Sequence, residues 1–344
     1  MVKVESLFPI PGSKRGKKYA MLRPAPWQTQ SCEPFMGGAA KSLEFGLKAS
    51  LAEINPPQRK LARIPANTKA IAEYTRFYRQ IAADFVAGID VDQLMSYVNR
   101  EQSMKALRAE IPHIAAILDE RWQPLKTRLF DEVKADTDWT AAPYSFCQRA
   151  CFGNVMRLNP LGTHYNVTWY VGKLANALRF DPETWCESLR SRRWNPTVFN
   201  NWEGAIAAVK SPYQTWLLLD PPYIEADGDR KMTPCYPGHF VTTADGRDAT
   251  YRLAIEPLRF GLRRGFPLIH LCNYYSTKLD ADVTAMAYES GYLCDRTMVG
   301  VCGSLGNSAG RYKHGQRVDS RPKPIECIWT FRPFEQLKLW EVPQ

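Results

Sequence analysis

The stretch from Trp216 to Tyr223 reads WLLLDPPY, an apolar run of strand length followed by an acid, two prolines and an aromatic residue. Pro221 and Pro222 have a fixed φ and no amide hydrogen, so the backbone must leave a β-sheet at this point. The resulting turn would hold the Asp220 carboxylate, bare carbonyls and the Tyr223 ring outside the carboxyl edge of a sheet. Open α/β sheets bind their ligands at that edge. We therefore expect chemistry at Asp220.

A second candidate site lies near the start of the chain, at the glycine pair Gly37-Gly38. A short strand is expected to enter this pair and a short helix to leave it. A second strand, over residues 50–54, is expected to end in the sequence Glu53-Ile54-Asn55. Small residues at such a turn let a ligand approach the backbone, and an acid ending the second strand can hold a ribose. Most glycine pairs are simple turns, so the spacing of Glu53 is what favours a cofactor here.

A third set of polar residues lies around the turn Asn159-Pro160-Leu161-Gly162. Aromatic and β-branched residues within 147–172 predict a hairpin with an exposed tip. Arg157 and Asn159 are two apart, so on a strand they would share one face. Arginine and asparagine suit bidentate contacts with guanine and adenine edges. Without further context, an ordinary structural role in the hairpin is the simpler interpretation.

The segments around these sites predict an α/β fold with a second domain inserted into it. From residue 68 to 133, apolar residues recur three and four apart, as at Ile71, Tyr74 and Tyr78, which predicts helices that form a helix-bundle core. Pro124 is expected to break or kink one of them. Strands and helices alternate again later in the chain. We expect helices over 200–210, 249–264 and 282–290, strands over 216–219, 267–272, 298–302 and 325–331, and a surface loop over 304–323.

Composition argues against several classes of protein. The 344 residues contain no apolar run near twenty residues and no secretory signal, so we expect no membrane span. The nine cysteines form no CxxC pair and the five histidines are scattered, so we expect no metal site and a reduced, cytoplasmic compartment. The net charge of +10 favours a phosphate-rich partner, although a basic protein without one is the alternative.

Taken in order, these motifs resemble those of the Dam-type (D12 class) DNA adenine N6-methyltransferases. The family's PGGK-like opening looks like Pro11-Gly12-Ser13-Lys14 here, and its EPFxGGG looks like Glu33-Pro34-Phe35-Met36-Gly37-Gly38-Ala39. The acidic DIN is similar to Glu53-Ile54-Asn55, and DPPY is present as Asp220-Pro221-Pro222-Tyr223. The family's hairpin CFNGLxRxNxxGxFNVPxG is similar to CFGNVMRLNPLGTHYNVTWYVG, and its LSN strand end is similar to His270-Leu271-Cys272-Asn273.

The resemblance implies a fold, a reaction and a set of residues. The fold would be a Rossmann-like methyltransferase sheet in residues 1–66 and 195–344, with a helical and β-hairpin target-recognition domain inserted over 67–194. The reaction would be methyl transfer from S-adenosylmethionine to N6 of adenine in double-stranded DNA, by base flipping and without a metal. Such an enzyme would belong to a restriction–modification system or be an orphan or phage methylase, as a monomer or a weak dimer.

The residue roles that the resemblance implies fall into three groups. Asp220 and the Pro221 carbonyl would accept the two amino hydrogens, and Tyr223 would stack on the base. The catalytic set would be Asp220, Pro221, Pro222 and Tyr223. The cofactor would be held by Ile10, Lys14, Pro34, Phe35, Gly37, Gly38, Glu53, Asn55 and Asp220. The residues facing DNA would be Arg157, Asn159, Tyr165 and Asn166.

The chain departs from the family pattern at four places. Ala39 replaces a glycine, Glu53 replaces an aspartate, and Ile10 stands where many relatives carry an aromatic residue. Asn201-Trp202 occupies a place where relatives often have an acid before an aromatic residue, linked to cofactor adenine binding, and Glu203 could substitute.

Two alternatives stay open. One is amino methylation of another substrate, either cytosine N4 or adenine in RNA. The other is a DNA-binding protein that keeps the fold without the activity. The intact Asp220 and Tyr223 argue against the second alternative.

Overall fold

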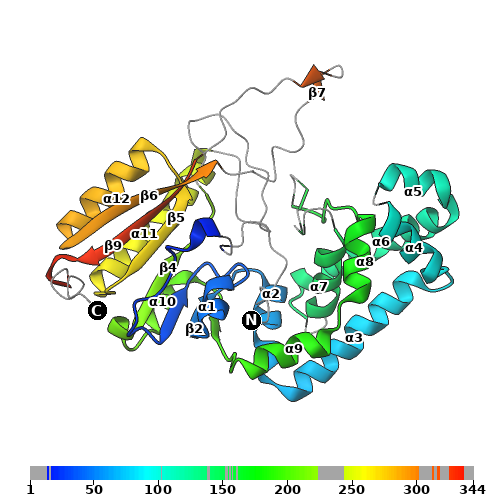
Figure 1. Ribbon diagram of the computed structural model, residues 1–344, viewed down its shortest axis with the longest axis horizontal. Coiled ribbons are helices and arrows are strands. Elements are labelled where there is room, and N and C mark those ends of the chain that lie inside the picture. The colour runs from blue at the N-terminus through cyan, green and yellow to red at the C-terminus, as the bar shows by residue number, and fades with distance from the viewer. Residues whose placement is uncertain are drawn as a thin grey trace. The chain divides into compact units, whose positions relative to one another are not determined.

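The computed structural model describes residues 14, 17–101, 103–137, 140–151, 154, 156, 158–159, 162–223, 244–301, 312–313, 316–317 and 325–336. These residues divide into two compact units (Figure 1). The first unit contains Ile54–Asn195, and the second contains the described residues of 14–53 and 196–336. The expected domain boundaries between residues 66 and 67 and between 194 and 195 stay predictions.

The second unit is an α/β structure built on a seven-stranded, mostly parallel sheet, which confirms the predicted α/β class. The strand order is β3-β2-β1-β4-β5-β9-β6. Each neighbouring pair from β3 to β5 is parallel, whereas β9 runs antiparallel to both β5 and β6. The strands are β1 (Gln30–Glu33), β2 (Lys48–Ala52), β3 (Thr197–Phe199), β4 (Thr215–Leu219), β5 (Ile269–Tyr274), β6 (Tyr292–Val301) and β9 (Ile325–Pro333).

The strand order reverses direction between β1 and β4, which are neighbours in the sheet. Open α/β sheets bind their ligands at the carboxyl ends of the strands beside such a reversal. Asp220 follows β4 and Pro34 follows β1. The sheet therefore brings these two motifs, which are far apart in the sequence, to one edge.

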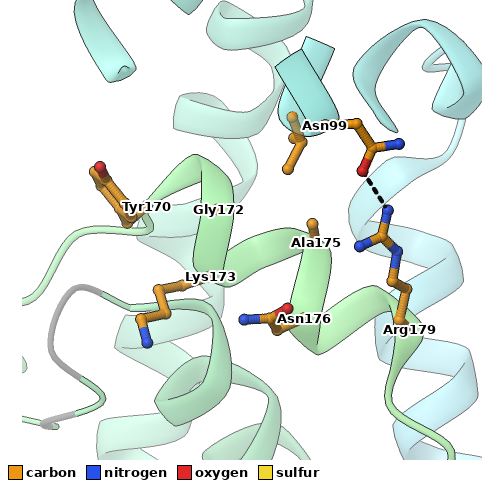
Figure 2. Close-up of a pocket in the computed structure, with 8 residues that line it drawn as sticks. Asn99, Tyr170, Gly172, Lys173, Ala175, Asn176 and Arg179 are labelled. Carbon is orange, nitrogen blue, oxygen red and sulfur yellow. Dashed lines mark hydrogen bonds between the residues drawn. The ribbon is translucent and has the colours of Figure 1, made fainter. Parts of the chain in front are cut away.

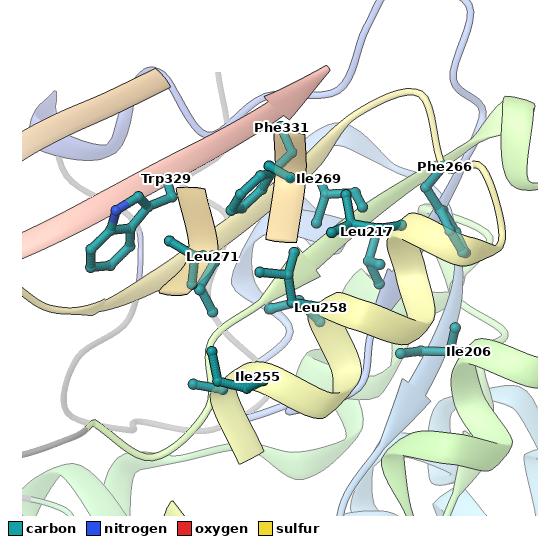
Figure 3. Close-up of a cluster of buried hydrophobic side chains, with 14 of the residues drawn as sticks. Ile206, Leu217, Ile255, Leu258, Phe266, Ile269, Leu271, Trp329 and Phe331 are labelled. Atoms are coloured by element: carbon teal, nitrogen blue, oxygen red, sulfur yellow. The ribbon is translucent and has the colours of Figure 1, made fainter. Parts of the chain in front are cut away.

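Both faces of the sheet are covered, as the apolar character of β4 requires. Leu217 and Leu219 belong to one buried cluster and Trp216 and Leu218 to another, because side chains alternate along a strand. Helices α10 (Trp202–Ala207), α11 (Ala244–Arg263) and α12 (Thr277–Glu289) supply the first cluster. Figure 3 shows Leu217 and its sheet neighbours with Leu258 of α11. The segment around the short helix η1 (Lys17–Tyr19) and Leu22 supplies the second cluster.

The first unit is mainly helical. The predicted helix with apolar residues three and four apart is confirmed, because Ile71, Tyr74 and Tyr78 are all buried on α3. The prediction of a break at Pro124 was wrong, since α6 continues through that residue. The packing of Leu118 and other buried side chains along this helix outweighs the lost hydrogen bond. The helices are α2 (Pro56–Arg63), α3 (Thr68–Val86), α4 (Val91–Arg100), α5 (Met104–Glu110), α6 (Pro112–Lys134), α7 (Ala141–Ala150), α8 (Val171–Arg179) and α9 (Pro182–Ser191).

The predicted hairpin over 147–172 is present in part. Helix α7 extends to Ala150, and antiparallel bridges Cys151↔Trp169 and Leu158↔Tyr165 then flank the turn. The turn uses Gly162 at φ +69°, a left-handed conformation that glycine adopts easily. The segment 304–323, expected as a loop, contains the two short paired strands β7 (Tyr312–Lys313) and β8 (Gln316–Arg317), and its other residues lie outside the described ones.

Candidate functional site

Asp220 lies where the sequence predicted, directly after the last residue of β4. Its side chain is 27% exposed, although its Oδ1 atom is shielded from solvent. The exposed fraction therefore belongs to the rest of the side chain, which can meet a ligand. Pro221 is buried and Pro222 is half-buried, so the turn that carries the acid is anchored.

Lys14 occupies the shielded side of this acid. Its Nζ atom lies 3.2 Å from Asp220 Oδ1 and 2.8 Å from Glu326 Oε1, and it donates a hydrogen bond to the Tyr223 hydroxyl. The lysine is only 6% exposed. Burial alone would lower the pKa of Lys14, but Asp220, Glu326 and other neighbours together raise it well above its ordinary value. Lys14 is therefore a permanent buried cation.

Glu326 of β9 completes the cluster and is fully buried. Its Oε1 accepts from Lys14 and from the Tyr223 hydroxyl at 2.5 Å, and its Oε2 accepts from the Tyr19 hydroxyl at 2.6 Å. Lys18 Nζ lies 3.4 Å from the same Oε2. Burial alone would raise the pKa of this acid, but Lys14 and the two hydroxyls lower it to about 2.

Asp220 experiences the opposite balance. Burial raises the pKa of the Asp220 carboxyl above its ordinary value, Lys14 counteracts this rise, and Glu326 adds to it. Tyr223 packs edge-on against Tyr274, with ring centroids 4.7 Å apart and an interplanar angle of 78°. The site thus combines a partly open carboxylate, an aromatic ring of fixed plane and a buried cation.

Glu33, at the end of the neighbouring strand β1, is a second buried acid. Its Oε1 accepts from the backbone N–H of Ser42 at 2.8 Å and also from the Ser42 hydroxyl. Burial raises the pKa of Glu33 to about 7, with Ser42 opposing the rise and Asp220 adding to it. Pro34 is buried and Phe35 half-buried immediately after it.

The glycine turn between β1 and α1 (Ala40–Phe45) has an unusual backbone. Gly37 has φ +47° and Ala39 has φ +45°, which is a strained conformation for alanine. The Ala39 N–H donates to the Met36 carbonyl at 2.7 Å, and the Met36 N–H donates to Ala52 at 2.9 Å. The turn containing Gly38 is therefore hydrogen-bonded to the last residue of β2.

Glu53 follows β2 and is buried, with its backbone N–H donating to the Phe199 carbonyl at 3.1 Å. Asn55, in the first unit, donates from Nδ2 to the Tyr144 hydroxyl at 2.8 Å. Asn201 caps α10, since its Oδ1 accepts from the Gly204 N–H at 2.7 Å. The side-chain oxygen of Asn201 is therefore already used within the chain.

The candidate DNA-facing residues have different environments. The Asn159 side chain holds the hairpin turn, because its Oδ1 accepts from the Thr163 N–H at 2.7 Å and its Nδ2 donates to Thr163 Oγ1 at 3.0 Å. Tyr165 is buried and packs edge-on against Phe130. Asn166 is exposed. Arg157 and the cofactor candidate Ile10 lie outside the described residues.

A hollow of about 260 Å³ lies within the first unit (Figure 2). Arg179 crosses part of it and donates from Nη2 to Asn99 Oδ1 at 2.8 Å. None of its eight described lining residues is acidic, and two of them, Lys173 and Arg179, are cations. The sequence reading did not single out these residues.

Glu326 and its contact with Lys14 were also not anticipated. The signal that could have revealed Glu326 is its place in the run Ile325-Glu326-Cys327-Ile328-Trp329, because an acid within an apolar strand requires a buried partner. The partner lies at the other end of the chain, so the sequence gives no local indication of it.

Among the residues that the structure describes, no group of His, Cys, Asp or Glu side chains could hold a metal ion. Within the same residues, no helix combines the length and apolar character of a membrane span. Seven described cysteines are free thiols, and Cys294 is the one of them that is not buried. The chain matches no model of a known protein family and no curated protein sequence.

Proposed function

We propose that this protein is a site-specific DNA methyltransferase that transfers a methyl group from S-adenosylmethionine to N6 of adenine in double-stranded DNA. The observation that carries the proposal is the position of Asp220. A partly open carboxylate follows β4 beside the glycine turn that follows β1, at the reversal point of the strand order. This is the edge where an α/β sheet binds a nucleotide-like ligand.

The residues at this edge suit methylation of an amine. The N6 nitrogen of adenine is a poor nucleophile, because its lone pair is delocalised into the ring. Hydrogen bonds to Asp220 and the Pro221 carbonyl would draw both amino hydrogens out of conjugation. The bond to the charged acceptor strengthens as the nitrogen becomes positive. As the nitrogen bonds to the methyl carbon, the bond from this carbon to sulfur would break and release S-adenosylhomocysteine. The methylated nitrogen would then give up its extra proton to solvent, so Asp220 acts as a hydrogen-bond acceptor and not as a general base.

Tyr223 provides the stacking surface for the flipped base. Flipping costs a few kcal/mol, and one stacked aromatic ring returns about 1–3 kcal/mol of it. The Tyr223 ring is half-buried, and its plane is set by the edge contact with Tyr274 and the hydroxyl bond to Glu326. A ring fixed in this way loses little freedom when a base stacks on it.

The turn after β1 and the acid after β2 fit the cofactor. Gly37 and Gly38 present backbone without side chains, and Glu53 at the next strand end suits the ribose hydroxyls. S-adenosylmethionine would supply the methyl group on a positively charged sulfonium. Lys14 forms an ion pair with Asp220 and donates hydrogen bonds to Glu326 and Tyr223. We therefore assign it to the support of the acid and not to the cofactor.

In this proposal the second unit is the Rossmann-like methyltransferase domain and the first unit is the inserted target-recognition domain. In the hairpin, exposed Asn166 would contact DNA, whereas the Asn159 side chain is bonded within the turn and Tyr165 is buried. The hollow beside Lys173 and Arg179 suits a backbone phosphate. Replacing Lys173 by glutamine should make the negative slope of log affinity against log salt concentration shallower by about one.

The test is transfer of a tritiated methyl group to mixed genomic DNA. The wild-type protein should label the DNA, and Asp220→Ala should reduce the rate by about 10²-fold or more. Glu335→Gln, an exposed acid beyond β9, serves as the matched control. Labelling that survives Asp220→Ala would refute the role of Asp220. DNA binding without any labelling by the wild type would favour a DNA-binding protein without activity.

A further inference from the structure

We propose that Glu326 is a positioning residue that neutralises the charge of Lys14, so that the site keeps a net negative charge beside the amine that Asp220 binds. This inference rests on the proposed function. It assigns a role to a strand, β9, that carries none of the recognised motifs.

The first step is the charge of the cluster. Lys14 Nζ lies closer to Glu326 Oε1, at 2.8 Å, than to Asp220 Oδ1, at 3.2 Å. With both acids ionised, the three side chains carry a net charge of −1. Without the charge of Glu326 they would carry none. A net negative site matches an amine that becomes positive during methyl transfer, and a neutral one does not.

The second step is the orientation of the groups. Glu326 accepts from Lys14 and Tyr223 on one oxygen, and from Tyr19 and Lys18 on the other. One buried carboxylate therefore fixes both the cation behind Asp220 and the hydroxyl of the stacking ring. These hydrogen bonds offset the cost of burying the acid, whereas a partly bonded carboxylate would leave that cost uncompensated.

The third step is the set of neighbours that could alter this charge balance. The titratable groups facing the cluster come from the segment before β1, the end of β1, the end of β4, and strand β5. They are Lys14, Lys18, Tyr19, Glu33, Asp220, Tyr223 and Cys272. Lys14 is the buried cation among them, so its removal is the change that should compensate for loss of the Glu326 charge.

The experiment compares Glu326→Gln, Lys14→Met and the double variant with the wild type. Glutamine keeps the size of the side chain and an acceptor oxygen but removes the charge. Glu326→Gln should lower kcat by roughly tenfold to a hundredfold while the KM for DNA stays within about threefold. The double variant restores a net charge of −1 on Asp220, so it should be more active than either single variant. Tyr19→Phe removes a hydrogen bond without changing the charge and should cost less activity than Glu326→Gln.

A double variant that is no more active than either single variant would overturn the inference, because a purely structural role predicts additive losses. Thermal unfolding of each variant identifies loss of folding. If Glu326→Gln does not fold, the comparison of Lys14→Met with the double variant decides, and the double variant should be the more active at pH 7. A wild-type protein that transfers no methyl group would refute the proposed function. If the wild type is active but the double variant is no more active than the single variants, only the role of Glu326 is refuted.

Discussion

Replacing Lys14 by methionine should move the acid limb of the pH–rate profile for methyl transfer to higher pH. Asp220 must be ionised to hold the amine, and Lys14 is the neighbour that keeps its pKa down against burial. Lys14→Met removes this cation and leaves Glu326 beside Asp220, so the pKa of Asp220 should rise. The activity would then be lost at mildly acidic pH and recovered at alkaline pH.

The magnitude follows from the geometry. Two unit charges 3.2 Å apart, the distance from Lys14 Nζ to Asp220 Oδ1, interact by about 5 kcal/mol at an effective dielectric constant near 20. Solvent access to Asp220, which is 27% exposed, makes the effective loss smaller. An opposite charge at such a distance ordinarily lowers the pKa of an aspartate by about 1–3 units. We therefore expect the acid limb to rise by roughly 1–3 pH units.

The assay is the single-turnover rate of methyl transfer, measured from about pH 5 to about pH 10. Lys18→Met is the matched control, since Lys18 contacts Glu326 at 3.4 Å from a side chain that is 45% exposed. Its acid limb should move much less than that of Lys14→Met. An acid limb that stays in place in Lys14→Met, or moves to lower pH, would refute the reasoning.

Other predictions concern stability and DNA binding. Ala39→Gly should raise the free energy of unfolding by roughly 0.5–1 kcal/mol, because glycine adopts the left-handed conformation without strain. The opposite type of change at another left-handed position, Gly46→Ala at φ +63°, should lower it by about 1 kcal/mol. Urea unfolding measures both, and changes of the same sign in the two variants would contradict this prediction. Because the folded pKa of Glu33, about 7, exceeds its ordinary 4.5, wild-type stability should fall as pH rises between these values, and Glu33→Gln should recover up to about 3 kcal/mol at pH 8 but little at pH 4.5. A denaturation midpoint that Glu33→Gln raises equally at both pH values would contradict this prediction. Asn159→Ala should destabilise the hairpin by about 1–2 kcal/mol, whereas Asn166→Ala should leave the melting temperature nearly unchanged and weaken DNA binding in titrations; the reverse pattern would contradict their assigned roles.

The sequence predicted the parts of the site that depend on local signals. An apolar run stopped by Pro221 and Pro222 is a local pattern, and it placed Asp220 at the end of β4. The glycine turn after β1 is equally local. Their proximity follows from the parallel sheet, in which β1 and β4 are neighbours.

Other features depend on long-range packing and could not be predicted. Lys14 and Glu326 are 312 positions apart in the chain, and no periodicity records such a pair. The motif register assigned Tyr165 to the DNA-facing residues, which stays a prediction, and its burial against Phe130 is not visible in that register. Pro124 lies inside α6 because packing along the helix overrides its local preference.

The central claim is most directly tested by identifying the methylated nucleoside. Mixed genomic DNA would be incubated with the protein and S-adenosylmethionine, digested to nucleosides and analysed by mass spectrometry. We predict N6-methyl-2′-deoxyadenosine as the new nucleoside, present with the wild type and strongly reduced with Asp220→Ala. N4-methyl-2′-deoxycytidine as the product, or no new methylated nucleoside at all, would contradict the account.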